Sequence, residues 1–183
     1  MRLYRQTVED FGLYPGMELD DSQMEALRTG AGKMSARMRA VRIVSATSVS
    51  KRDLEERLVR KGEDPRQARQ AVEWMSDLNL VDDSQMAAQV VSRCISKGYG
   101  LSRARQALYE KKVPREYWED ALADYPDQSE KIEEFLKSRL SDQPDEREVR
   151  RAVDALLRRG HRWAEIRRVL KDLDQETDGF QEE

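Results

Sequence analysis

The feature that most constrains this chain is an internal repeat, a unit of roughly 45 to 50 residues that occurs three times in succession. When the sequence is shifted along itself by 50 and then by 48 residues, a helix pair aligns in all three copies without a gap. A unit of two or three short helices cannot bury its own apolar face, whereas stacked neighbours can. The repeat therefore predicts an all-α fold, an elongated curved array of three tandem three-helix repeats with a short N-terminal extension. The aligned positions are Leu54, Leu58, Gly62, Ala68, Ala71 and Val72, then Ala104, Leu108, Lys112, Trp118, Ala121 and Leu122, then Ala152, Leu156, Gly160, Ile166, Val169 and Leu170.

The spacing of apolar residues places the helices within each repeat. Asp82-Asp83-Ser84-Gln85 and Asp127-Gln128-Ser129-Glu130 are predicted to cap the first helices of the second and third repeats. Gly62 and Gly160 stand where second helices should end, and Lys112 is the exception at the equivalent position. The second helices are predicted over 50–61, 101–112 and 145–159, and the third helices over 64–78, 114–124 and 161–173.

Breaks in the apolar pattern divide the chain into five segments. Residues 1–32 are predicted to be an N-terminal extension with a short helix at about 20–28, after which Arg28-Thr29-Gly30-Ala31-Gly32 breaks the chain. The three repeats are predicted over 33–81, 82–126 and 127–173. Residues 174–183 are acidic and nearly free of apolar groups, which predicts a disordered tail.

Composition excludes several classes of protein. The chain is 38% hydrophobic and 38% charged, which suits thin helical layers better than one deep core. It has no run of 18 apolar residues, so no membrane-spanning segment is predicted. A single cysteine excludes an intrachain disulfide framework, and a cytoplasmic location is expected.

Few residues offer catalytic or metal-binding chemistry. His161 has no orienting acid and nucleophile beside it in the sequence, which favours a surface or capping role. Cys94 lies on an apolar helix face, typical of a small buried hydrophobic residue. Lys97-Gly98-Tyr99-Gly100 lacks the third glycine of a nucleotide loop, so we expect Gly98 to end a helix in a left-handed conformation. Asp82 and Asp83 lack the glycine-centred loop of a calcium site. We therefore predict no enzyme activity, no cofactor and no metal.

The tryptophans fall on the third helices. Trp118 and Trp163 are predicted on the core stripe, whereas Trp74 lies beside it and is a candidate for contact with a partner or the next repeat. Packing is favoured over nucleobase stacking for all three.

Basic residues gather in two blocks, over 33–75 with a net charge of +5 and over 149–171 with a net charge of +6. Arginine outnumbers lysine in them, which favours bidentate contacts to phosphate or carboxylate. The alternative is a solvated face partly neutralised by neighbouring acids such as Glu55 and Glu56. The candidate contacts to a partner or to DNA are Lys51, Arg52, Arg57, Arg60, Lys61, Arg66 and Arg69 in the first block, and Arg150, Arg151, Arg158, Arg159, Arg162, Arg167 and Arg168 in the second.

Two stretches of the middle repeat carry a family resemblance. They are Leu80-Val81-Asp82-Asp83-Ser84-Gln85-Met86-Ala87 and Lys97-Gly98-Tyr99-Gly100-Leu101-Ser102-Arg103. With Leu58-Val59-Arg60-Lys61-Gly62 of the first repeat, their order and spacing resemble the RecX family of bacterial regulators of the RecA recombinase. The resemblance covers about residues 8–172. It departs from the family pattern at Asp53, Met86, Ala104 and Lys112.

The resemblance implies a non-enzymatic modulator that binds in the groove of the RecA–single-stranded DNA filament and limits filament extension, ATP hydrolysis and strand exchange. It implies RecA as the partner, with single- or double-stranded DNA bound weakly or through RecA, and a monomeric protein. The basic blocks by themselves leave two alternatives open, a stand-alone helical nucleic-acid-binding module and a protein-interaction scaffold.

Overall fold

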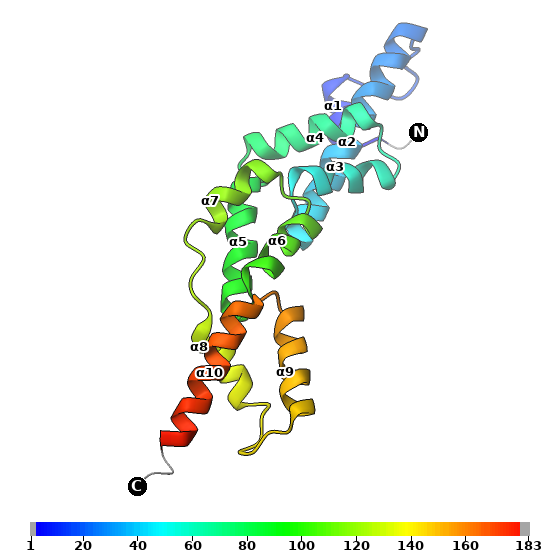
Figure 1. The fold of residues 1–183 in the computed structure, drawn as a ribbon. Coiled ribbons are helices and arrows are strands. Elements are labelled where there is room, and N and C mark those ends of the chain that lie inside the picture. Colours follow the sequence, from blue (N-terminus) through cyan, green and yellow to red (C-terminus); the bar gives the residue numbers. More distant parts are fainter. Residues whose placement is uncertain (1–2, 180–183) are drawn as a thin grey trace. The chain divides into compact units, whose positions relative to one another are not determined.

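The computed structural model describes residues 3–179, with side chains as far as Asp174. All regular secondary structure in this range is helical, as the repeat predicts (Figure 1). The chain divides between Met86 and Ala87 into two compact units. The division falls within one helix, α5 (Asp83–Ser96).

The first unit holds the first repeat and the N-terminal segment. Its helices are α1 (Arg5–Asp10), α2 (Asp21–Ala46), α3 (Lys51–Arg60) and α4 (Pro65–Asp77). Side-chain oxygens of Asp20, Ser50 and Asp64 accept hydrogen bonds from the free amides at the starts of α2, α3 and α4, which fixes where these helices begin. The residues predicted to be buried form one core, which contains Leu54, Leu58, Ala68, Ala71, Val72 and Met75.

The helix break predicted at Gly30–Gly32 is wrong, because α2 runs through both glycines to Ala46. A Cβ added at Gly30 would overlap the Phe11 ring, and one added at Gly32 would overlap the side-chain amide of Gln67. The glycines therefore allow the end of α1 and the start of α4 to approach α2 closely. The packing of α2 against its neighbours offsets the modest free-energy cost of placing glycine within a helix. The pattern of apolar residues in the sequence does not show this packing.

Two buried carboxylates connect helices of the first unit. Asp83 accepts a hydrogen bond from the backbone amide of Lys51 at 2.9 Å, whereas its neighbour Asp82 caps α5 through the amide of Gln85 at 3.0 Å. Glu63, in the turn after α3, pairs with Arg39 of α2 at 2.6 Å. The capping role predicted for the acidic pair is thus carried by Asp82, and Asp83 anchors the start of α3.

The second unit continues along α5 and holds most of the second repeat and the third repeat. Its elements are α6 (Leu101–Glu110), the 3-10 helix η1 (Arg115–Tyr117), α7 (Trp118–Leu122), α8 (Ser129–Lys137), α9 (Glu146–Arg158) and α10 (Trp163–Gly179). Helices α8 and α10 lie side by side, with α9 completing the group (Figure 1). Their shared core contains Ile132, Leu136, Ala152, Val153, Leu156, Ile166 and Val169.

Two helices differ in length from the prediction. The helix expected over 114–124 is divided into η1 and the five-residue α7, and it ends shortly before Tyr125, where Pro126 disfavours a helical conformation. Helix α10 continues to Gly179, which corrects the disorder predicted over 174–179, since adding residues to an existing helix costs little. Residues 180–183 lie outside the described residues.

The turn before α6 meets the turn after α9 within the second unit. The Gly100 amide donates to the Arg159 carbonyl at 2.9 Å, and the Ser102 amide donates to the Gly160 carbonyl at 3.3 Å. A Cβ added at Gly100 would overlap the Gly160 carbonyl, and one added at Gly160 would overlap the Arg103 amide. Two backbone segments about 60 residues apart in sequence thus touch directly, which only glycine permits at these positions.

Each second helix ends in a left-handed residue at the same repeat position. The φ angles are +92° at Gly62, +54° at Lys112 and +87° at Gly160, and Gly98 after α5 has φ +62° as predicted. Lys112 therefore adopts a conformation that costs a residue with a Cβ about 1 kcal/mol relative to glycine.

We expect Lys112→Gly to be more stable than Lys112→Ala by about 1 kcal/mol, because both substitutions remove the lysine side chain but only glycine relieves the backbone strain. Chemical denaturation of the two variants measures the difference. Equal stability of the glycine and alanine variants would contradict the left-handed assignment.

Candidate partner-binding surface

The candidate cations of the first repeat fall into two groups, those paired with acids and those without a side-chain partner. Arg57 pairs with Asp53 at 2.8 Å, Arg52 with Glu56 at 3.1 Å, and Arg69 with Glu55 at 3.4 Å. Each pairing lowers the charge available to a partner. Arg60, Lys61 and Arg66 are exposed and have no side-chain hydrogen bond or ion pair among the described residues, and the half-buried side chain of Lys51 has none either.

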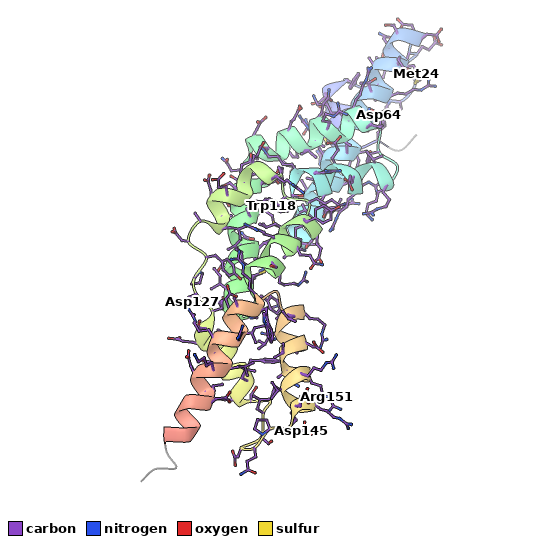
Figure 2. All side chains as sticks on the ribbon, in the orientation of Figure 1. Met24, Asp64, Trp118, Asp127, Asp145 and Arg151 are labelled. Atoms are coloured by element: carbon purple, nitrogen blue, oxygen red, sulfur yellow. The ribbon has the colours of Figure 1, made fainter. Side chains whose placement is uncertain are left out.

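The third repeat carries more unpaired charge. Arg150, Arg151 and Arg158 lie on the exposed side of α9, and Arg162 and Arg167 are exposed at the start of α10. None of these five side chains has a hydrogen-bonded or ionic partner within the described part of the chain. Figure 2 shows Arg151 extending outward from α9. Because helix α9 contributes three of these cations on exposed positions, it presents a concentrated positive surface.

Two predicted contact residues of the third repeat are engaged within the protein. The Arg159 guanidinium donates to the Lys97 carbonyl at 2.5 Å and lies over the rings of Tyr99 and Phe135, at 5.0 and 5.3 Å from their centroids. Arg168 pairs with Asp127 at 3.0 Å and contacts the Ser129 hydroxyl. Arg159 is thus a structural residue of the turn contact, and Arg168 joins α10 to the start of α8.

The tryptophans are only partly where the sequence predicts them. Trp74 packs against the core of the first unit, with the Arg37 guanidinium 4.8 Å from its ring centroid. Trp118 is half-buried, and its Nε1 donates to the Val113 carbonyl at 3.0 Å. Trp163 is exposed, which corrects the prediction of a core position, because α10 begins at this residue and turns its first apolar side chain outward. Leu157 of α9, which directly follows the buried Leu156, is also exposed.

The sole histidine is a buried part of the turn contact. Of the surface or capping role predicted for it, the surface position is wrong. His161 Nε2 lies 3.0 Å from the Gly98 carbonyl, so Nε2 must carry the proton, whereas the buried Nδ1 has no hydrogen-bond partner. Burial lowers the pKa of His161, opposed by the hydrogen bond to Gly98 and by Glu165, while Arg159 lowers it further. The fold therefore favours the neutral ring.

We expect acid to destabilise the protein through His161. The unfolded chain binds this proton near pH 6.5 and the folded chain only at lower pH, so the contribution is complete above about 6.5 and is lost as the pH falls from there through the lower pKa of the folded state. Because the chain has one histidine, its imidazole NMR signal can be titrated directly, and the midpoint should lie below 6.5. His161→Gln should lessen the loss of stability between about pH 7 and pH 5.5. A midpoint at or above 6.5 would contradict the buried neutral ring.

Other reactive groups lie in structural positions. Burial raises the pKa of the Cys94 thiol, although Arg103 and Lys97 act in the opposite direction, and a raised pKa disfavours the reactive thiolate. Burial also raises the pKa of Tyr125 to about 12, and its hydroxyl donates to the Tyr99 carbonyl at 2.6 Å. Among the described residues, no three His, Cys, Asp or Glu side chains gather as metal ligands, and no helix is long and apolar enough to span a bilayer.

Comparison with known proteins shows which family this chain belongs to. A sequence model described as the second three-helix domain of RecX matches residues 82–122. The "Regulatory protein RecX" of Xanthomonas axonopodis pv. citri (strain 306) is 30% identical over 136 residues, which cover 73% of this chain and 84% of that protein. The chain belongs to the RecX family. The "Regulatory protein RecX" of Halorhodospira halophila (strain DSM 244 / SL1) is 26% identical over 153 residues, covering 81% of this chain and 94% of the relative.

A RecX crystal structure supports the fold independently. The crystal structure of a regulatory protein RecX superposes with a TM-score of 0.73, at 20% identity, and covers 92% of this chain and 86% of that one. Met86 and Ala104, two of the positions at which the sequence departs from the family pattern, are buried.

Proposed function

We propose that this protein is a non-enzymatic modulator of RecA that binds in the groove of the RecA–single-stranded DNA filament. There it limits filament extension, ATP hydrolysis and strand exchange. Membership of the RecX family carries this proposal, since its curated relatives bear the name of a regulatory protein. We also propose that it acts as a monomer in the cytoplasm, with the repeats over 33–81, 82–126 and 127–173 as its structural units.

The distribution of charge supports a binding role. Eight candidate cations are exposed and lack a side-chain partner among the described residues, namely Arg60, Lys61, Arg66, Arg150, Arg151, Arg158, Arg162 and Arg167. Exposed and unpaired guanidinium groups are suited to the carboxylates of an acidic protein groove and to DNA phosphates. By contrast, His161 and Cys94, the side chains best suited to nucleophilic or acid–base chemistry, are held in structural contacts.

A second candidate function is stand-alone binding to nucleic acid, which the unpaired arginines of α9 and α10 favour. Binding that rests on phosphate contacts weakens steeply with salt and needs no protein partner. We place this function second because Arg52 and Arg69 of the first repeat are paired with neighbouring acids, which lowers the charge available to phosphate.

The decisive experiment adds the purified protein to RecA on single-stranded DNA. We expect micromolar protein to lower DNA-dependent ATP hydrolysis and to shorten the filaments seen by electron microscopy. Binding to the same DNA without RecA is measured in parallel at low and high salt. Unchanged ATP hydrolysis and filament length would refute the proposal, and tight, salt-sensitive binding to DNA alone would favour the second function.

A further inference from the structure

Large apolar side chains are exposed at one recurring position of the repeat. Val59, Tyr109 and Leu157 are 39%, 70% and 43% exposed, and they stand 50 and then 48 residues apart, at equivalent sites in the three copies. Each directly follows a fully buried leucine of the second helix. A single exposed apolar residue needs no explanation, but its return at the same register in every copy does.

The surroundings of Val59 and Leu157 match closely. Each has an arginine seven residues before it, an acidic residue three before it and an arginine directly after it. Positions three and seven residues back lie on the same side of a helix. We name these sets the α3 face (Arg52, Glu56, Val59 and Arg60) and the α9 face (Arg150, Asp154, Leu157 and Arg158).

Three of the four arginines in the two faces are free of internal partners within the described part of the chain, whereas Arg52 pairs with Glu56. Arg60, Arg150 and Arg158 are exposed and have no side-chain partner among the described residues. The α3 face borders a hollow of the surface lined by Arg52, Glu55, Glu56, Val59 and Arg60, so Val59 lies in a recess that another chain can fill. The middle repeat departs from the pattern, since Ser102, Gln106 and Glu110 replace the first arginine, the acid and the second arginine around Tyr109. The likeness is therefore specific to the first and third repeats.

We infer that the α3 and α9 faces are two copies of one protein-docking surface, each of which binds an equivalent acidic-rimmed apolar patch on two subunits of a protein polymer. This inference rests on the proposed function, in which the polymer is the RecA filament. Two matching faces on one chain fit a partner that presents the same patch repeatedly. An apolar anchor bordered by arginine is typical of the centre of a protein interface.

The composition of the faces disfavours DNA as their occupant. Glu56 and Asp154 place a carboxylate within each face, where it repels phosphate. Val59 and Leu157 have no aromatic ring on which a base can stack. A protein patch can set its apolar groups against Val59 or Leu157 and its acidic groups against the flanking arginines, and it need not place an acid opposite Glu56 or Asp154.

The test replaces the anchors with glutamine, which is polar, uncharged and favourable to helices. We expect Val59→Gln and Leu157→Gln each to raise the concentration needed for half-inhibition of RecA ATP hydrolysis by about 5-fold, as for loss of one interface anchor. The double variant should require about 30-fold more protein or worse, because two faces bound to one polymer reinforce each other. Leu80→Gln, at a leucine that is also exposed but lies outside this register, is the control, and circular dichroism checks that all variants remain helical.

Each outcome decides the matter. If the wild type inhibits RecA but the anchor variants inhibit as well as Leu80→Gln does, the docking inference is wrong and the proposed function stands. A double variant no weaker than the worse single variant also overturns it, because only one face would then bind. A wild type without effect on RecA refutes both the proposed function and this inference. Loss of binding to DNA alone, with inhibition of RecA intact, would assign the faces to DNA instead.

Discussion

Replacing Gly100 with alanine is expected to destabilise the second unit by about 3 kcal/mol or more, one of the larger effects that a single methyl group can have. The φ angle of Gly100 lies in the ordinary helical and extended range, at −74°, so its backbone tolerates any residue. The cost is steric, because the new Cβ would overlap the carbonyl of Gly160 and the amide of His161. Backbone atoms cannot move aside as a flexible side chain does.

Relief of this overlap would break the contact between the two turns. If the two segments separate, the hydrogen bonds from Gly100 to Arg159 and from His161 to Gly98 lengthen or break. The buried polar groups that form these bonds are then left without partners, which is costly. We expect the variant to lose stability and to expose the Arg159 side chain, which now lies over Tyr99. Chemical denaturation followed by circular dichroism measures the first effect.

Gly62→Ala is the matched control for Gly100→Ala. Gly62 has φ +92° and open space where a Cβ would lie, so alanine there costs only the left-handed strain of about 1 to 2 kcal/mol. Comparison of the two variants separates a steric cost from a conformational one. If Gly100→Ala is no more destabilising than Gly62→Ala, the close approach of the two turns is wrong.

Reversing the charge of Arg60, Lys61 and Arg158 together is expected to weaken inhibition of RecA by about 10- to 100-fold while leaving the helical content unchanged. Each is exposed and lacks a side-chain partner among the described residues, so the substitution breaks no ion pair within the protein. Like charges brought together at an interface cost about 0.5 to 1 kcal/mol per exposed pair, which yields this range for three positions. Arg159 is left out of the set, because its contact with the Lys97 carbonyl makes it structural.

The control reverses Lys33, Arg42 and Arg105, which changes the net charge equally, lies in α2 and α6, and likewise breaks no ion pair among the described residues. Inhibition is compared through RecA ATP hydrolysis at low and high salt, since electrostatic attraction between exposed groups is screened by salt. We expect the wild type and the control to differ little, and the difference from the Arg60, Lys61 and Arg158 variant to shrink as salt rises. Equal losses in both variants would mean that net charge, and not these positions, governs binding.

Much of the fold could be predicted from the sequence because its determinants are local. The capping residues Asp20, Ser50 and Asp64 act on amides two or three residues away, and Leu58, Leu108 and Leu156 recur at the spacing that an amphipathic helix requires. Gly62 and Gly160 end their helices as predicted, and Lys112 adopts the same left-handed conformation, although its residue type gives no sign of it. The family resemblance also rests on residues close together in sequence.

The candidate surface was less predictable. All the candidate cations look alike in the sequence, yet Arg57 and Arg69 are paired with acids, Arg168 bonds to Asp127, and Arg159 is held by a carbonyl 62 residues away. The exposure of Trp163 was also not predictable, because it depends on the residue at which α10 begins. Helical periodicity describes which side of a helix is apolar, but it does not describe which partner a long charged side chain reaches.

The sequence by itself thus determined the helices, their caps, the buried leucines and the three-fold repeat, because each depends on residues within one or two helical turns of each other. The tertiary structure alone decided that α2 passes through Gly30 and Gly32, that His161 is a neutral residue bonded to Gly98, and that only part of the basic surface is free for a partner. These features depend on atoms that folding brings together from distant parts of the chain. Whether a glycine breaks a helix or admits a neighbour, and whether an arginine is free or engaged, depends on what lies beside it in space.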